Sequence, residues 1–280
     1  MRTRRLGPWL SPALTVTAAA ALIALERRYP LRRSVERRSR HDARNLAVAA
    51  LGAVALRLAE RPCVAPLAAL VERRRWGVLK QLPLPAWLDA PLALILMDYT
   101  LYLWHVLTHR VAWLWRFHLV HHVDRDLTAS TALRFHVGEL LLSVPWRAMQ
   151  VAAIGVSPGP LRLWQTMLLL SILFHHSNLR LPPELERRLA RVIMTPRLHG
   201  IHHSAVRRER DANWSSGLTL WDRLHGTLEL DVPQDAITIG VPSYQERREL
   251  SLGAILAMPF GRERPCSALL PKSGARRSLG

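Results

Sequence analysis

Long apolar segments alternate along the chain with short segments rich in arginine. The longest apolar segments approach the roughly 20 residues that a membrane-crossing helix needs. The pattern therefore predicts several membrane helices, even though the second segment carries Arg57 and the fourth carries Glu139 and Arg147. The five segments are residues 9–25, 46–59, 85–107, 137–156 and 161–174.

Three connecting regions complete the expected layout. The sequence GVSPGP at 155–160 is rich in residues that break helices, and it predicts a tight turn between two crossings that form a hairpin. Residues 61–85 fit either a surface helix or a short re-entrant segment, and the pattern favours neither. Residues 184–194 follow two prolines and predict an amphipathic helix.

The charge of the chain agrees with a membrane location. The formal net charge is +18, which alone would indicate nucleic acid, but nearly all of the excess is arginine that flanks apolar segments. We therefore expect contact with lipid headgroups and no nucleic-acid partner. Eight arginines between 180 and 210 predict that this part faces the cytoplasm. Arginines at the N-terminus and at 73–75 would then lie on the other side, against the same rule.

Histidine is concentrated in one part of the sequence. All but one of the thirteen histidines lie between 98 and 225, and five of them fall between Asp98 and Asp124. Residues three or four apart share a face of a helix, so pairs such as His105 and His109 point in one direction. Each cluster adjoins an apolar segment, which indicates a metal site at a membrane surface.

The number of histidines limits which kinds of metal centre the clusters can form. Imidazole binds zinc, copper, iron and nickel alike, so the type of ligand leaves the metal open. The clusters supply too many histidines for one tetrahedral zinc, which takes four ligands or three and a water. They suit two metals that each keep a free position, an arrangement that indicates an oxygen-activating di-iron centre.

The motifs also resemble those of a known family. DYxxYxxHxxxH, FHxxHH, FxHxN and HxxHH followed by WDRLxGT closely resemble the fatty acid hydroxylase and sterol desaturase superfamily over residues 95–230. The resemblance implies an all-α integral membrane helical bundle with a cytoplasmic, histidine-rich cap that holds two iron ions. It divides the chain into N-terminal membrane helices at 1–94, a catalytic domain at 95–230, and a C-terminal cytoplasmic extension with a basic tail at 231–280.

The resemblance assigns roles to individual residues. Asp98, Asn178, His175 and Glu139 are expected around the ligands, where a polar group can hold the second nitrogen of an imidazole. His136 lies in HVGE, where many relatives have HPxE, and it is equally a candidate tenth ligand or a residue outside the site. The nine expected ligands are His105, His109, His118, His121, His122, His176, His199, His202 and His203.

Several other residues have more than one interpretation. His225 is expected to pack against its neighbours, and His41 is expected to be solvated. The aromatic residues around the motifs fit either packing at the membrane interface or the lining of a tunnel for a lipid chain. These aromatic residues are Trp104, Trp113, Trp115 and Phe117.

The activity implied by the resemblance is the O₂-dependent hydroxylation or desaturation of a lipid C–H bond. Fatty acyl, sterol and related lipids all remain open as substrates. No flavin, haem or iron–sulfur motif is present, so we expect a separate reductase with a ferredoxin or a cytochrome b5-like carrier. The alternative is a non-catalytic membrane protein of the same fold that binds metal.

Overall fold

The computed structural model describes residues 10–262 and 264, and over these residues the chain is helical. Within this part the only β-structure consists of three isolated bridges. The helices of the first half are α1 (Leu10–Arg28), α2 (Arg38–Ala55), α3 (Arg61–Arg74), α4 (Val78–Gln81), α5 (Ala86–Arg110) and α6 (Ala112–His122). Those of the second half are α7 (Val137–Ile154), α8 (Pro158–His176), α9 (Pro183–Leu189), α10 (Pro196–His202), α11 (Arg207–Arg210), α12 (Leu220–Leu224) and α13 (Leu252–Ala257).

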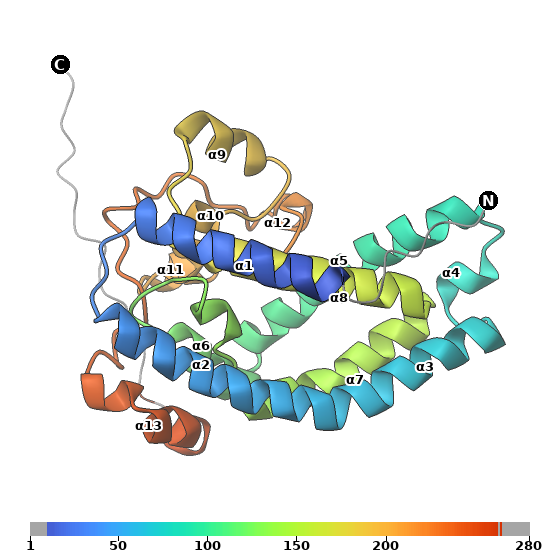
Figure 1. Cartoon of the computed structure of the whole chain (residues 1–280), viewed down its shortest axis with the longest axis horizontal. Helices are drawn as coiled ribbons and strands as arrows, with labels where there is room; N and C mark the ends of the chain where they lie inside the picture. Colours follow the sequence, from blue (N-terminus) through green and yellow to red (C-terminus); the bar gives the residue numbers. More distant parts are fainter. Residues whose placement is uncertain (1–9, 263, 265–280) are drawn as a thin grey trace.

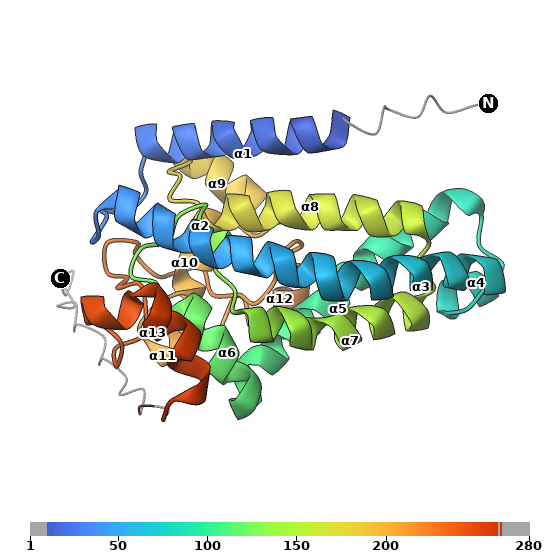
Figure 2. The same ribbon diagram turned by 60° about the horizontal axis from the view of Figure 1, so that its bottom comes forward.

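The long helices run roughly side by side, with α4 at one end of the molecule and α6, α10, α11 and α13 toward the other (Figures 1 and 2). We call the end that holds α6 and α10 the histidine end, because the histidine motifs lie there. Buried apolar side chains of α3, α4, α5, α7 and α8 form a core toward the opposite end. The first helix, α1, lies along α8 (Figure 2).

The region that the sequence left open, residues 61–85, continues the preceding helix. A π-helical turn, Leu56–Glu60, joins α2 to α3 without a break. Pro62 is the second residue after this turn, and a proline cannot donate the backbone hydrogen bond of a regular helix, so a widened turn accommodates it. The helix then packs against α7 and turns back through α4.

The two helices after the histidine clusters begin and end close to where the sequence places them. Gly155 ends α7 in the left-handed region, with φ of 91°, and α8 begins at Pro158. They do not pack as a simple hairpin, since α3 and α5 each pack against both of them. The turn nevertheless returns the chain to the histidine end, where α8 closes with His175 and His176.

One predicted helix is shorter than expected. The helix expected at 184–194 ends at Leu189, because the residues after it pair with another loop. The backbone N–H of Met194 donates to Gly217 O at 2.9 Å, and that of Thr219 donates to Val192 O at 3.0 Å. These bonds hold the loop before α12 against the segment that leads into α10.

The segment after residue 230 covers the histidine end. Val241, Tyr244 and Leu250 are buried against Trp115 and Leu119 of α6. The expected boundaries at 95 and 230 divide the sequence into regions. In space, however, the region after 230 shares a hydrophobic core with α6.

Candidate metal centre

A break between α5 and α6 places the first two histidine motifs face to face. Val111 has an extended backbone, with φ of −94° and ψ of 111°, between the end of α5 and the start of α6. The two helices then pack against each other. The rings of His109 and His122 lie 4.7 Å apart between centroids, and those of His105 and His118 lie 5.2 Å apart.

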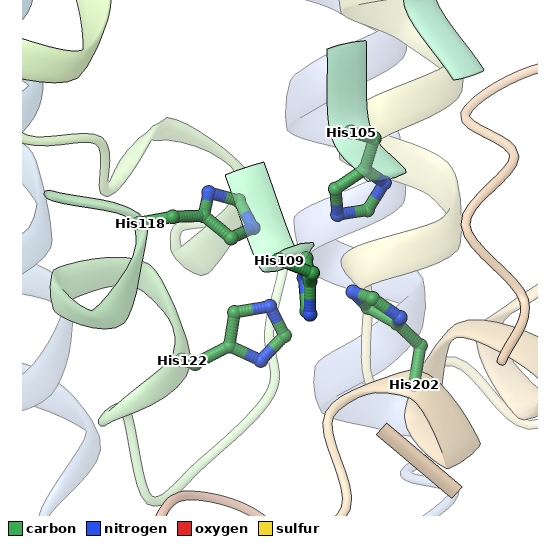
Figure 3. Close-up of side chains that lie close together, drawn as sticks. All are labelled: His105, His109, His118, His122 and His202. Carbon is green, nitrogen blue, oxygen red and sulfur yellow. The ribbon is translucent and has the colours of Figure 1, made fainter. Parts of the chain in front are cut away.

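The nine expected ligands fall into two groups. In the first group, one nitrogen of each ring lies within 4.8 Å of the others, and the rings point toward one another (Figure 3). The second group meets the same limit of 4.8 Å. The first group is His105, His109, His118, His122 and His202, and the second is His121, His176, His199 and His203.

Each HxxHH motif contributes to both groups. Successive residues on a helix point about 100° apart, so His121 and His122 cannot face the same centre. His122 joins the first group and His121 joins the second. In the other motif, His202 joins the first group while His199 and His203 join the second. The two groups therefore share α6 and α10, while α5 supplies His105 and His109 to the first group and α8 supplies His176 to the second.

The Nε2 atoms of the second group lie close together. His176 Nε2 lies 3.0 Å from His121 Nε2 and 3.0 Å from His199 Nε2. His203 Nε2 lies 3.2 Å from His199 Nε2. Two nitrogens bound to one metal at about 2.1 Å and at right angles are about 3.0 Å apart. The separations thus suit nitrogens that share a metal ion.

Four of the nine imidazoles have their other nitrogen held by an oxygen. His118 Nδ1 lies 2.8 Å from the Glu139 carboxylate. In the remaining three, Nδ1–H donates to a backbone carbonyl, which leaves the Nε2 lone pair free to bind metal. These bonds join His105 to Trp214 O at 2.6 Å, His176 to Ile172 O at 2.8 Å and His202 to Ala212 O at 2.8 Å.

Burial keeps these rings in the form that binds metal. Desolvation, reinforced by the neighbouring histidines, holds the pKa of His122, His199 and His203 well below the ordinary value of 6.5. A neutral imidazole is the form that coordinates metal. Within the described residues, buried ring nitrogens such as His118 Nε2, His202 Nε2 and both nitrogens of His122 have no hydrogen-bond partner. An unpaired buried nitrogen is costly, and a bound metal ion would satisfy it.

Of the four residues expected around the ligands, Glu139 contacts an imidazole in the expected way. Asp98 does not: its carboxylate accepts from Leu218 N at 3.0 Å and from Trp221 Nε1 at 2.7 Å, so it anchors the loop before α12. Asn178 also differs, since its amide pairs with the backbone of Arg32 at 2.8 Å on both sides. Both side chains hold loops in place and do not contact an imidazole of either group.

His175 and His136 lie at different distances from the two groups. His175 is buried, with its ring centroid 4.1 Å from that of His199, although it belongs to neither group. His136 lies apart: its Nδ1 accepts from Gly138 N at 2.9 Å and its Nε2 donates to Leu256 O at 3.2 Å. Both ring nitrogens of His136 are occupied, and it begins α7 as an N-cap, so we leave it out of the proposed ligand set.

Two histidines remain: His225 lies at the surface, and His41 is buried. His225 is exposed and stacks on Tyr102, with centroids 5.0 Å apart, as expected for packing. The expectation that His41 is solvated is wrong. His41 is 1% exposed, and its Nε2 lies 2.9 Å from Asp124 Oδ2. The arginines next to His41 in the sequence suggested a solvated segment. Its buried partner, Asp124, comes from a distant part of the sequence.

Asp124 is the centre of a buried polar network that sequence reasoning missed. Its carboxylate accepts from Asn45 at 3.0 Å and from Thr131 at 3.0 Å, and it lies 3.3 Å from Arg44 Nη2. The network ties α2 to the end of α6, two residues after His122. The signal in the sequence was a lone aspartate at the end of HxxHH, but its partners on α2 lie about 80 residues away.

An apolar cavity of about 740 Å³ leads to both groups. It lies between α2, α5, α7 and α8, and its wall reaches His105 and His118 of the first group and His121, His176 and His199 of the second. Of the four aromatic residues considered for a tunnel, Trp104 lines this cavity. Trp113 is 54% exposed, Trp115 packs beneath His109 and His122, and Phe117 packs on His136.

Known proteins are similar in sequence to this chain. The sequence profile described as "Fatty acid hydroxylase" matches residues 90–227. An ornithine lipid hydroxylase of Rhizobium tropici is 31% identical over 175 residues, which are 61% of this chain and 50% of that protein. The human alkylglycerol monooxygenase is 29% identical over 137 residues, 48% of this chain and 29% of that protein.

A human cholesterol 25-hydroxylase is 30% identical over 147 residues, 48% of this chain and 49% of that protein. The chain thus spans about half or less of the length of these three relatives. No solved structure matches it significantly. The matched residues include all nine histidines of the two groups, and the three relatives are each similar over about half of this chain or more than half. We conclude that residues 90–227 of the chain belong to the fatty acid hydroxylase family.

Proposed function

We propose that this protein is a membrane-bound lipid hydroxylase or desaturase that uses O₂ and holds two iron ions, one in each histidine group. The observation that carries the proposal is that two all-histidine groups meet at the end of one apolar cavity. An apolar wall selects an aliphatic chain, and the relatives named above are lipid hydroxylases and monooxygenases.

The proposed ligands are the nine histidines of the two groups. When bound there, iron would supply the oxygen and electron-transfer chemistry that amino-acid side chains lack. The chain's own contribution is to orient the ligands. Glu139 and the carbonyls of Trp214, Ile172 and Ala212 fix ring orientation, and the cavity wall excludes water from the C–H bond that is to be oxidised.

The surface of the long helices supports a location in the membrane. Within the described residues one helix, Ala86–Arg110, is long and apolar enough to cross a membrane by length and composition. Neighbouring helices expose large apolar side chains on their outer faces, which water would disfavour. Examples are Leu14 at 63%, Val54 at 56%, Leu58 at 72% and Met167 at 52% exposed. We propose a multi-pass protein on this ground.

We further propose that the histidine end faces the cytoplasm. Exposed arginines near that end, such as Arg33, Arg40 and Arg208, agree with the bias of cytoplasmic loops. Arg73 and Arg74 end α3 at the other end and oppose it. A cytoplasmic site is accessible to a separate reductase with a ferredoxin or cytochrome b5-like carrier, which we propose as the electron source.

Metal content and oxygen uptake test the proposal. We expect purified protein to hold close to two irons and to consume O₂ when it is reduced in the presence of lipid. The substitution His202→Ala removes a ligand, so it should lower activity by about 100-fold or more and lower the iron content. His225→Ala, an exposed histidine outside both groups, is the matched control and should change neither.

Two outcomes would contradict the proposal. Protein that holds zinc alone and consumes no O₂ would support the non-catalytic metal-binding protein. Unchanged iron and activity in His202→Ala would show that the first group is not the metal site.

A further inference from the structure

The apolar cavity becomes polar at the end away from the histidines. Most of its wall is formed by alanine, leucine and aromatic side chains. Its far part is instead lined by Arg147 of α7, Trp164 and Gln165 of α8, and Glu60 at the end of the π-helical turn. None of these four residues belongs to either histidine group.

Arg147 is the unusual member of this polar end. It is 9% exposed, and within the described residues its Nε and Nη1 atoms have no hydrogen-bond partner. A guanidinium that is removed from water normally acquires a partner, because an unpaired buried charge is costly. Burial of the Arg147 guanidinium therefore costs free energy unless a molecule that enters the cavity supplies acceptor oxygens.

The neighbours of Arg147 hold it in place without satisfying it. Its guanidinium lies 4.0 Å from the centre of the Trp164 ring, a stacking contact that fixes its plane. Glu60 is engaged elsewhere, since its Oε1 accepts from Gln165 Nε2 at 3.1 Å. The charge of Glu60 favours the charged guanidinium through space, but no hydrogen bond or ion pair joins the two side chains among the described residues. The result is a pre-oriented donor at the wall of an apolar cavity.

The separation of this donor from the histidines follows from the helices that carry it. Arg147 follows Glu139, the partner of His118, by eight residues, which is about 12 Å along a helix. Trp164 precedes His176 by twelve residues, which is about 18 Å along a helix. The cavity therefore joins two different chemical sites that are more than one helical turn apart.

We propose that Arg147 binds the anionic headgroup, a carboxylate or phosphate, of an amphiphilic substrate whose hydrocarbon chain extends to the histidine groups. The inference rests on the proposed function, because it assigns the two ends of the substrate of that site. A planar guanidinium pairs well with either oxyanion. The substrate class is then a single-chain amphiphile that is oxidised far from its headgroup, at a position set by the distance from Arg147.

A purely packing role for Arg147 makes a different prediction. If the guanidinium served only to stack on Trp164, the cavity would bind a hydrocarbon as well as a fatty acid of equal length. Loss of Arg147 would then leave the preference between the two ligands unchanged.

Binding to purified, metal-free protein in detergent separates these cases. The probes are palmitate, hexadecyl phosphate and hexadecane, which share one chain length and differ at the head. We expect both anions to bind wild-type protein more tightly than hexadecane. Whichever anion binds more tightly identifies the headgroup, and equal binding of all three ligands would overturn the proposal.

Variants identify the group responsible. Arg147→Met should weaken binding of the preferred anion by about 10- to 100-fold, the effect of losing a hydrogen bond to a charged group, and leave hexadecane binding intact. Arg147→Lys should retain part of the preference. Arg162→Met is the matched control, since Arg162 is exposed on the same helix as Trp164 and outside the cavity. Retained hexadecane binding shows that a variant is folded.

Photo-crosslinking tests the direction in which the chain lies. A palmitate with a diazirine next to the carboxylate should label peptides that contain Arg147 or Trp164. A diazirine next to the methyl end should label the wall near Phe135 and Leu46. Reversed labelling would overturn the proposal. Because the protein is metal-free, these results hold whether or not the loaded protein consumes O₂, so failure of the proposed function is distinguishable.

Discussion

At the scale of single residues, the site depends on partners that orient each imidazole. Glu139 is the one side chain among the described residues whose carboxylate contacts a ring of either group, at 2.8 Å from His118. The carbonyls of Ile172, Ala212 and Trp214 serve the same purpose elsewhere. A backbone carbonyl is not removed by mutating its own side chain, so Glu139 offers the cleanest test of this orienting role.

We predict that Glu139→Ala weakens metal binding without abolishing it. Loss of a hydrogen-bond partner to a ligand histidine typically costs 10- to 100-fold in metal affinity, and we expect about that loss here. Competition with a chelator measures it. Glu139→Gln keeps an acceptor oxygen and should recover part of the loss. Glu184→Ala, a carboxylate exposed on α9, is the control, and an equal effect of both alanine variants would refute the role.

The pair formed by His41 and Asp124 predicts a pH dependence of stability. Burial alone would lower the pKa of His41, but the charge of Asp124 and hydrogen bonds to Asp124 and Asp42 raise it from 6.5 to about 10. A histidine whose pKa is raised by folding contributes stability that is complete below the unfolded pKa and declines as the pH approaches the folded one. The contribution should therefore be full below about pH 6.5 and decline toward pH 10.

The variant His41→Leu tests this contribution. At pH 6 it should lower the free energy of unfolding by about 3 kcal/mol, because it removes the buried cation that lies closest to the Asp124 carboxylate. The difference from wild type should shrink as the pH rises toward 10. Chemical denaturation in detergent at several pH values measures the loss of unfolding free energy at pH 6 and its change with pH. His225→Leu, at an exposed histidine, should show no such pH dependence, and a difference that stays constant with pH would contradict the assignment.

At the scale of elements, two turns meet at the end opposite the histidines. Gly77, before α4, and Gly155, after α7, both have φ of 91°. A Cβ on Gly77 would lie 2.2 Å from Gly155 N, so the two backbones touch. This contact links the α3–α4 turn to the α7–α8 turn, and α7 and α8 form walls of the apolar cavity. Only glycine fits both the conformation and the approach.

We predict that Gly77→Ala destabilises the protein by about 2 kcal/mol or more, since it adds left-handed strain and a backbone clash. Thermal unfolding in detergent measures the change. Gly159→Ala is the matched control, because a Cβ at Gly159 meets nothing within 4 Å. Equal melting temperatures for Gly77→Ala and wild type would show that the contact between the turns is unimportant.

At the scale of the whole molecule, the two ends differ in chemistry. The histidine end carries the candidate metal centre and most of the loops, while the opposite end is closed by α4 (Figure 1). Between them, exposed apolar side chains such as Leu58 and Met167 surround the long helices. An apolar surface between two polar ends fits a bilayer, with the cavity running along the direction of the lipid chains.

Cysteine labelling tests this orientation. In a chain with Cys63 and Cys266 replaced by serine, we place one cysteine at Arg208 or at Arg73. In sealed, right-side-out vesicles, an impermeant maleimide should label the cysteine at 73 and reach the one at 208 only after permeabilisation. The opposite pattern would put the histidine end outside the cell, and labelling of both would refute a membrane-spanning arrangement.

The sequence by itself determined the long helices α5, α7 and α8 and the histidines of the candidate centre. Apolar runs and breakers such as GVSPGP are local signals, so the positions of α5, α7 and α8 followed from them. The spacing within each histidine motif is also local, because a helix converts it directly into direction. All nine histidines that the motifs selected lie in the two groups.

Only the tertiary structure decided how the motifs combine. The division of His121 and His122 between groups, the engagement of Asp98 with Trp221, and the burial of His41 against Asp124 all depend on contacts between distant segments. Such partners are brought together by packing, which no local pattern encodes. The same is true of Arg147, which looked like a charge out of place in an apolar segment until the structure put it at the wall of a cavity.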